Sequence, residues 1–596
     1  MIVGILLAFG FLQIVFVERA PDFLRDDAFY ADAARALMQQ HFYGINGRPE
    51  TNMPPGLSGL LALLCMVSVC GHVAVLRAMA VLQTLGFLAS YLFLRRVAPR
   101  WVAGLTCVIL ISSPIYFAQA TEWLVAFYPY FVVTMCALLV ARHVESTEAY
   151  GRQGLLWTGL LALLCAASVM MASAGIALIV ALVVRAIIVS AVGGRAGLRV
   201  VRRYALAAAA GTVFQALWMR RTPAPLEWPL AGYPRPYLQQ LLVKSGNYPE
   251  LGMATLRDIP ERIASNAVER SAFLSQLLLR HWIDPHWASF APIVVFSLII
   301  LGWCRCLRGT GGEVHDWYFA GHEFIYLLWP WSLEPRFFLP VAPLACLYLW
   351  EGARTVGRWL KASPRRVGRV WLPIAAILVF GSAAWIGSSN GVTSVAAGAQ
   401  ARLSLALWVI SGLFATWLAW RGQEWATPLR RFDNRLAPGL VTTSQRSLRA
   451  ARIGAWLVAV ILVAIGFGEQ LRIARANIDL HSDVNRLTAD AEAGIWLHTH
   501  TDARSVVMAR YLPTTLHYSA RREVWFPPSS NPQLLMEGIR RLKVDYVVVV
   551  HRDENYYLPS DDSSFDHLVA AYPQQFCLAY ATTRFSIFRT RRGEGA

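Results

Sequence analysis

Long apolar segments recur along this chain of 596 residues, and they constrain its fold more than any other feature. Hydrophobic residues make up 56% of the sequence and charged residues only 15%. The hydrocarbon core of a bilayer, about 30 Å thick, requires about 20 mostly apolar residues in a spanning helix. The sequence therefore predicts a polytopic α-helical membrane protein rather than a soluble enzyme.

The window criterion predicts about 13 transmembrane helices. The first apolar run, 1–17, lacks the basic start and the small-residue cleavage site of a signal peptide, so we expect an uncleaved span. The other predicted spans are 73–94, 101–118, 123–141, 154–172, 174–192, 203–219, 288–304, 317–333, 337–353, 371–388, 402–420 and 453–468. The run 57–70 is too short to span at about 1.5 Å per residue, and we expect it to lie at the interface.

Arginine-rich loops fall on one side of the membrane when 57–70 is not counted as a span. These loops are 95–100, 142–152, 195–203, 305–308, 354–369 and 421–452. The positive-inside rule makes them and the N-terminus cytoplasmic, and it accounts for the net charge of +18 without nucleic-acid binding. The first loop 18–72, the long loop 220–287 and the C-terminus are then extracytoplasmic. We expect a multi-pass protein of the cell inner (plasma) membrane, in contact with membrane lipids.

The composition changes after residue 470, where helical and strand-like patterns alternate. Helices are predicted over 482–498, 532–542 and 565–572, and strands over 505–509, 544–550, 576–582 and 585–590. The pattern predicts a small extracytoplasmic α/β domain, 470–596, after a transmembrane domain, 1–469. No Walker loop, Rossmann glycine pattern or zinc-ligand spacing is present in the sequence, and the nine cysteines show no disulfide framework.

Two adjacent acids, Asp26 and Asp27, begin the polar part of the first outer loop. A helix start accounts for one of them, since Asp near a helix N-terminus satisfies free backbone N–H groups. Carboxylates at the membrane face also suit coordination of a cation or general-base catalysis on an acceptor hydroxyl. Neighbouring side chains on a helix diverge by about 100°, so we expect one acid to face the reacting hydroxyl while the other orients or caps.

Three further residues on the outer face are candidates. Glu122 lies in a short turn between two predicted spans, where it is either a solvated loop acid or part of the site. Arg336 lies at the outer mouth of the span 337–353, against the positive-inside trend, and its guanidinium suits a phosphate. The alternatives for Arg336 are a lipid headgroup or a pair with Glu334. Arg77, at the outer start of 73–94, is a candidate of the same kind.

The order of these motifs resembles the GT-C superfamily of membrane glycosyltransferases. It most resembles the branch that holds the dolichyl-phosphate-mannose protein mannosyltransferases and the ArnT-like lipid A aminoarabinose transferases. The motifs, spread over roughly residues 1–360, are Asp26-Asp27-Ala28-Phe29-Tyr30, Pro54-Pro55-Gly56-Leu57, Ser113-Pro114 with Glu122, and Arg336-Phe337-Phe338-Leu339-Pro340.

The resemblance implies an inverting hexosyl- or pentosyltransferase that uses a polyprenyl-phospho-sugar donor. The acceptor would be a hydroxyl or phosphate group of a lipid, glycan or protein at the outer face. The resemblance assigns Asp26 as the catalytic acid residue, with Asp27 beside it, Glu122 as the second family acid, and Tyr30 to substrate binding.

Two positions depart from the family pattern. The acid pair is usually Asp-Glu, and Met53 stands where the aminoarabinose transferases have a Lys that helps to hold phosphate. More of the phosphate binding would then fall to arginines such as Arg336. A divalent cation, Mg or Mn, could replace part of this clamp, and the sequence leaves that open.

Two other classes of protein stay open. A transporter or flippase would carry charged residues inside its spans or paired broken helices, whereas the predicted spans are nearly free of acids. A non-catalytic envelope-assembly protein is the second alternative. Consumption of a polyprenyl-phospho-sugar by the purified protein separates these classes from a transferase.

Overall fold

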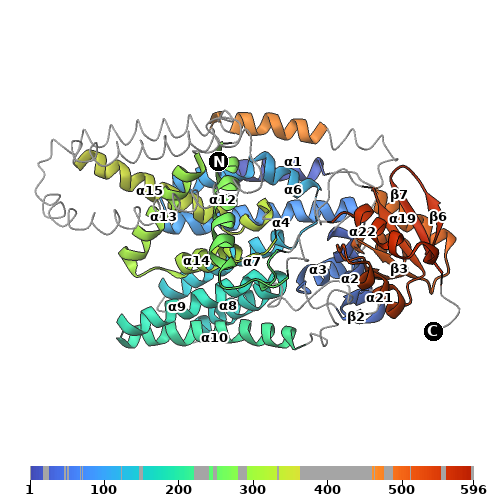
Figure 1. Ribbon diagram of the computed structural model, residues 1–596. Coiled ribbons are helices and arrows are strands. Elements are labelled where there is room, and N and C mark those ends of the chain that lie inside the picture. Colours follow the sequence, from blue (N-terminus) through green and yellow to red (C-terminus); the bar gives the residue numbers. More distant parts are fainter. Residues whose placement is uncertain are drawn as a thin grey trace, which may run out of the picture.

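Helices dominate the part of the chain that the structure describes, as the apolar runs predict (Figure 1). The computed structural model describes residues 2–17, 26–45, 48–49, 53–67, 69, 71–122, 124–146, 152–192, 194–220, 241–245, 252–279, 291–331, 334–362, 460–461, 463–475, 488–510, 512–551 and 559–591. Its elements up to residue 362 are α1 (Ile2–Val15), α2 (Asp26–Gln40), β1 (Gly44–Ile45), β2 (Arg48–Pro49), α3 (Gly56–Met66), α4 (His72–Val97), α5 (Arg100–Ile111), α6 (Pro114–Glu122), α7 (Phe127–Ser146), α8 (Arg152–Met171), η1 (Ser173–Gly175), α9 (Ile176–Val192), α10 (Gly194–Met219), α12 (Asp258–Leu279), α13 (Ala291–Thr310), α14 (Val314–Leu327), η3 (Pro335–Phe338) and α15 (Ala342–Ala362).

Four of the described helices are long and apolar enough to cross a membrane. They are α4, α7, α8 and the segment Ser173–Ala191, and α5 with α6 makes a fifth if this pair, bent by 56°, is one span. The chain is thus a multi-pass membrane protein, while the count of 13 spans stays a prediction. The predicted spans 371–388 and 402–420 lie outside the described residues. Helix α3 has only 11 residues, in line with the expectation that its run does not span.

Helices α13 and α15 approach each other closely at two glycines. A Cβ atom on Gly302 would lie 1.9 Å from the carbonyl oxygen of Tyr348, and one on Gly352 would lie 2.0 Å from that of Leu298. Small residues at helix contacts within membranes let backbones pack directly against each other. Both positions therefore require glycine, and the two helices pack as a unit.

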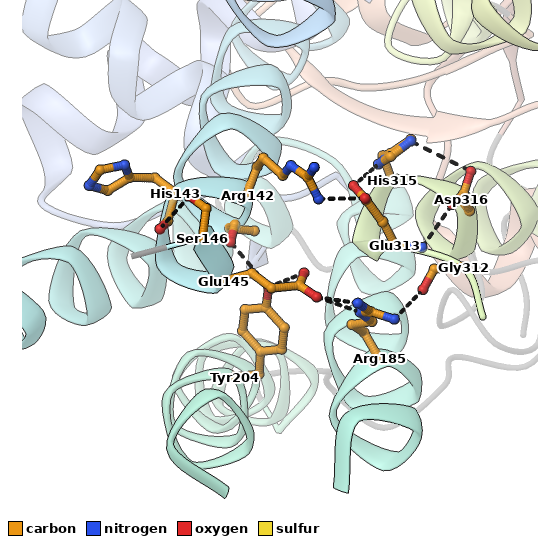
Figure 2. Close-up of polar contacts among 11 residues, drawn as sticks. Arg142, His143, Glu145, Ser146, Arg185, Tyr204, Gly312, Glu313, His315 and Asp316 are labelled. Atoms are coloured by element: carbon orange, nitrogen blue, oxygen red, sulfur yellow. Dashed lines mark hydrogen bonds and ion pairs between the residues drawn. The ribbon is translucent and has the colours of Figure 1, made fainter. Parts of the chain in front are cut away.

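A network of ion pairs joins α7, α9, α10 and α14 near residue 145 (Figure 2). Arg142 pairs with Glu313, and Arg185 pairs with Glu145. The hydroxyl of Tyr204 donates hydrogen bonds to the carbonyl oxygen of Ala141 at 3.1 Å and to Glu145 at 3.3 Å. Helix α7 has 20 residues and is about 30 Å long, so this network lies at the end of α7 opposite to Phe127. Its opposite charges pair with each other and fasten the helices together.

The C-terminal region, residues 488–591, forms a five-stranded sheet in the order β4-β3-β5-β7-β6. The three strands β4, β3 and β5 are parallel, while β7 pairs antiparallel with β5 and with β6. The elements of this region are α19 (Ala489–His500), β3 (Val506–Ala509), α20 (Leu512–Ser519), β4 (Arg522–Trp525), α21 (Pro532–Leu542), β5 (Tyr546–Val550), α22 (Asp561–Ala571), η5 (Pro573–Gln575), β6 (Phe576–Ala581) and β7 (Phe585–Thr590).

Helices cover both faces of this sheet, because successive side chains of its strands point to opposite sides. Val547 and Val549 pack with α21 and α22, while Val548 and Val550 pack with α19. The sequence predicts this α/β arrangement, and the limits of α21 and β7 agree with the predicted ones. It does not predict α20 and β4. The assignment of 1–469 and 470–596 as separate domains stays a prediction.

Helix α2 lies between the membrane bundle and the C-terminal region (Figure 1). It packs against α3 on one side and against α20 on the other. The Nδ1 atom of His517 on α20 lies 2.9 Å from Oδ1 of Asp32, which also pairs with Arg35 at 3.2 Å. The C-terminal region thus contacts the helix that begins with the acid pair.

One cysteine corrects the expectation from the sequence. Cys65, at the end of α3, is disulfide-bonded, so the expectation that the cysteines form no disulfide is wrong at this position. Seven other cysteines are not disulfide-bonded: Cys107, Cys136, Cys165, Cys304, Cys306, Cys346 and Cys577.

Candidate functional site

Asp27, the second acid of the pair, is buried. It is 6% exposed, and its Oδ2 atom accepts a hydrogen bond from the backbone N–H of Leu124 at 3.1 Å. The same oxygen lies 3.8 Å from Nε2 of His72, the first residue of α4. Asp27 therefore joins α2 to α4 and to the short segment between α6 and α7. Asp26 is the first residue of α2, and its side chain lies outside the described part of the chain.

Glu122, Asp27 and Arg336 all lie within electrostatic range of Tyr128. Glu122 is the half-buried last residue of α6, and Tyr128 lies in the first turn of α7. The charges of Arg336, Asp27 and Glu122 all act on the hydroxyl of Tyr128. Three candidates that are far apart in the sequence thus share one neighbourhood, at the end of α7 opposite to the network of Figure 2.

Arg336 pairs with Glu334, which was one alternative open from the sequence. Its Nε atom lies 2.7 Å from Oε2 of Glu334, and its Nη2 atom donates to Oε1 at 3.1 Å. The guanidinium also lies over the ring of Phe337, 5.3 Å from its centre. A phosphate at this place would therefore compete with Glu334 for the arginine, or share it.

Among the described residues, the observed contacts of Tyr30 and Arg77 do not include Asp27, Glu122, Arg336 or Tyr128. Tyr30 is half-buried on α2, packs against the bundle and has its ring 6.1 Å from that of Phe29. Arg77 is exposed on α4. Their proposed part in substrate binding stays a prediction.

Helix α12, within the loop 220–287, binds the C-terminal end of α14 through side-chain hydrogen bonds. The side-chain amide of Asn266 donates to the carbonyl oxygens of Tyr326 at 3.1 Å and Trp329 at 2.8 Å. Arg262 donates to that of Leu328 at 3.2 Å. The last carbonyls of a helix lack partners within the helix, and these side chains satisfy them.

Arg270 is a further residue near the site, and no pattern in the sequence points to it. Its side chain is 2% exposed, its Nε atom donates to Oε2 of Glu323 at 2.9 Å, and its guanidinium lies 4.5 Å from the ring centre of Phe338. It therefore connects α12 to α14 and to η3, which carries Arg336. Glu323 is a half-buried acid inside the predicted span 317–333, and Arg270 neutralises its charge.

Glu523 on β4, which is within electrostatic range of Asp32 on α2, has a raised pKa. Burial raises the pKa of Glu523 well above 4.5, and the charges of Asp490 and Asp32 raise it further, while a hydrogen bond from Ser519 lowers it. The hydroxyl of Ser519 lies 2.8 Å from Oε1 of Glu523. The contact between α2 and the C-terminal region thus includes an acid that favours its protonated form.

No group of three or more His, Cys, Asp or Glu side chains among the described residues gathers closely enough to hold a metal ion. The side chain of Asp26 is not one of those residues.

Comparison with known proteins found neither a matching protein-family model nor a matching curated protein. Among solved structures, the chain is similar to ArnT from Cupriavidus metallidurans in the apo state, with 14% identity, a TM-score of 0.49 and coverage of 98% of this chain and 96% of that one. It is also similar to the oligosaccharyltransferase AglB from Archaeoglobus fulgidus in complex with an inhibitory peptide and a dolichol-phosphate, with 11% identity, a TM-score of 0.46 and coverage of 92% and 69%.

Proposed function

We propose that this protein is a membrane glycosyltransferase of the GT-C type, which moves a sugar from a polyprenyl-phosphate carrier to an acceptor at the outer face of the membrane. The observation that carries this proposal is that Asp27, Glu122 and Arg336 all lie within electrostatic range of the Tyr128 hydroxyl, at one end of the bundle. Acids that can accept a proton and an arginine that can stabilise a phosphate are the groups that such a transfer requires.

The reaction follows from these groups. A carboxylate takes the proton of the acceptor hydroxyl, the acceptor oxygen forms a bond to the anomeric carbon, and the bond from that carbon to the carrier phosphate breaks. The phosphate leaves with the electron pair, and direct displacement inverts the anomeric centre. We assign the base to Asp26 and an orienting role to Asp27, because one oxygen of Asp27 already accepts the Leu124 amide.

Two independent features support an extracytoplasmic site. The basic loops lie at the other end of the predicted spans, as the positive-inside rule requires. Cys65 is disulfide-bonded on α3, which packs against α2, and disulfides persist in oxidising compartments outside the cytoplasm. We therefore place the acids of α2 and the C-terminal region on the outer side of the inner membrane.

The direct test uses the purified full-length protein in nanodiscs with a polyprenyl-phospho-sugar that carries a labelled sugar. Because sugar and acceptor are not fixed by the site, release of polyprenyl phosphate is measured in the presence of envelope lipid and glycan fractions. The proposal requires release that depends on the protein and on an acceptor fraction. If no donor is consumed with any fraction, while the protein moves the intact donor between leaflets, the protein is a flippase instead.

A further inference from the structure

The hydroxyl of Tyr128 is buried and has no hydrogen-bond partner among the described residues. The side chain is 0% exposed, so bulk water does not satisfy this group. A polar group removed from water without a partner costs free energy, and nearly all such groups in folded proteins have one. The described chain shows no reason in packing alone to keep a hydroxyl rather than a phenylalanine ring at this position.

The surroundings of this hydroxyl are those of the proposed reaction. Arg336, Asp27 and Glu122 are the charged groups that act on it. Oδ2 of Asp27 is already engaged by the Leu124 amide, and Arg336 by Glu334. The phenol therefore lies among the candidate residues without belonging to the hydrogen bonds that hold them in place.

We propose that Tyr128 contacts the substrate, and that its hydroxyl donates a hydrogen bond to an oxygen of the sugar–phosphate linkage. This inference rests on the proposed function and adds a residue to its site. When the bond from the anomeric carbon to the phosphate oxygen breaks, both electrons stay on that oxygen. A donor already aimed at the developing charge stabilises the transition state. The acceptor's proton goes to the carboxylate base, and Tyr128 keeps its own.

A shared water is the competing explanation. Tyr116 on α6 also has a buried hydroxyl without a partner in the described chain, and it lies within electrostatic range of Tyr128. One ordered water could satisfy both hydroxyls, since buried waters bridge such groups. In that case Tyr128 would serve stability alone.

The test is Tyr128→Phe in the full-length protein, with Tyr204→Phe as the matched control. Tyr204 is also 0% exposed, but its hydroxyl donates to Ala141 in the network of Figure 2, far from the site. We expect Tyr128→Phe to lower kcat for transfer by about 10²–10³, the scale of one lost transition-state donor. Its unfolding temperature should be unchanged or higher. Tyr204→Phe should keep kcat and unfold at a lower temperature.

Two outcomes would overturn the inference alone. One is wild-type kcat and KM in Tyr128→Phe. The other is a lower unfolding temperature with unchanged kcat, which would establish the shared water. Stabilisation by added polyprenyl phosphate is measured in parallel, and we expect a smaller shift in Tyr128→Phe than in the wild type. A wild-type protein that neither transfers sugar nor responds to polyprenyl phosphate would overturn the proposed function together with the inference.

Discussion

At the scale of single residues, Asp27 is fixed by its surroundings more firmly than a solvated helix cap would be. It is buried, it accepts the backbone N–H of Leu124 and it lies beside His72. These contacts join three segments of the chain at one carboxylate. The position of α2 relative to Glu122 therefore depends on Asp27, whichever acid takes the proton.

The two acids are expected to respond differently to the loss of charge. Asp26→Asn keeps the size of the side chain but removes the base, and should lower kcat by about 10²–10⁴, the usual range for a general base. Asp27→Asn keeps one oxygen for the Leu124 amide, and should lower kcat less. Transfer by both variants is compared in nanodiscs, with equal insertion as the control. If kcat fell more in Asp27→Asn than in Asp26→Asn, Asp27 would be the base and Asp26 the orienting residue.

Arg336 is expected to need its planar shape as well as its charge. Arg336→Lys keeps the charge but loses the fork that pairs with Glu334 and suits a phosphate. We expect KM for the donor to rise in Arg336→Lys and to rise further in Arg336→Ala. Glu334→Gln is the matched control, because it weakens the pair and leaves the arginine in place. Unchanged donor kinetics in both arginine variants would remove Arg336 from the site.

Glu523 should make the stability of the protein depend on pH. Because its pKa is raised well above 4.5, its stabilising contribution is complete below 4.5 and is lost as the pH rises through the folded-state pKa. Glu523→Gln should therefore stabilise the protein more at pH 8 than at pH 5. Thermal unfolding of the full chain at both values measures this, with the exposed Glu537→Gln as the control. If both substitutions changed the stability equally at the two pH values, the raised pKa of Glu523 would be contradicted.

At the scale of elements, the close contact of α13 with α15 is open to a direct test. Gly352→Ala would bring a Cβ atom to 2.0 Å from the carbonyl oxygen of Leu298, so we expect destabilisation by about 1–3 kcal/mol. Gly357→Ala, on the same helix with nothing within 4 Å, should stabilise by about 0.5–1 kcal/mol. Unfolding of both variants in detergent is compared. Equal stabilities would mean that the two helices are farther apart than described.

The sequence predicts some elements better than others, because only some of them have clear boundary signals. Helix α21 has strong boundary signals, since the side chain of Asn531 caps it, Pro532 follows at its first position and Lys543 ends it in a left-handed conformation. The segment that forms α20 and β4 has a proline, Pro513, and no clear periodicity. Its structure depends on packing against α2 and α19, which the sequence does not reveal.

The candidate site is predicted unevenly for a similar reason. Asp27, Glu122 and Arg336 stand out because charged residues are rare in so apolar a chain. Tyr128 does not, because a tyrosine in an apolar run looks the same whether it packs in the core or contacts a ligand. Only the missing partner of its hydroxyl, a property of the folded chain, separates the two cases.

At the scale of the whole molecule, the orientation in the membrane is testable with a native residue. Cys577 on β6 is free and exposed, whereas the other cysteines of the described chain that are not disulfide-bonded are buried or half-buried. A membrane-impermeant maleimide should label it in intact spheroplasts, and Cys577→Ser should abolish this labelling. Labelling that requires lysis would place the C-terminal region in the cytoplasm and reverse the proposed topology.

The contact between His517 and Asp32 also has a consequence for biogenesis. The two residues are 485 positions apart, so the partner of α2 is made long after α2 itself. At about 5–20 residues per second, the helix that bears the acid pair waits on the order of 25–100 s for α20. During synthesis the side of α2 that contacts α20 is therefore exposed. A chain that ends before residue 517 would insert into the membrane without the contact between α2 and α20.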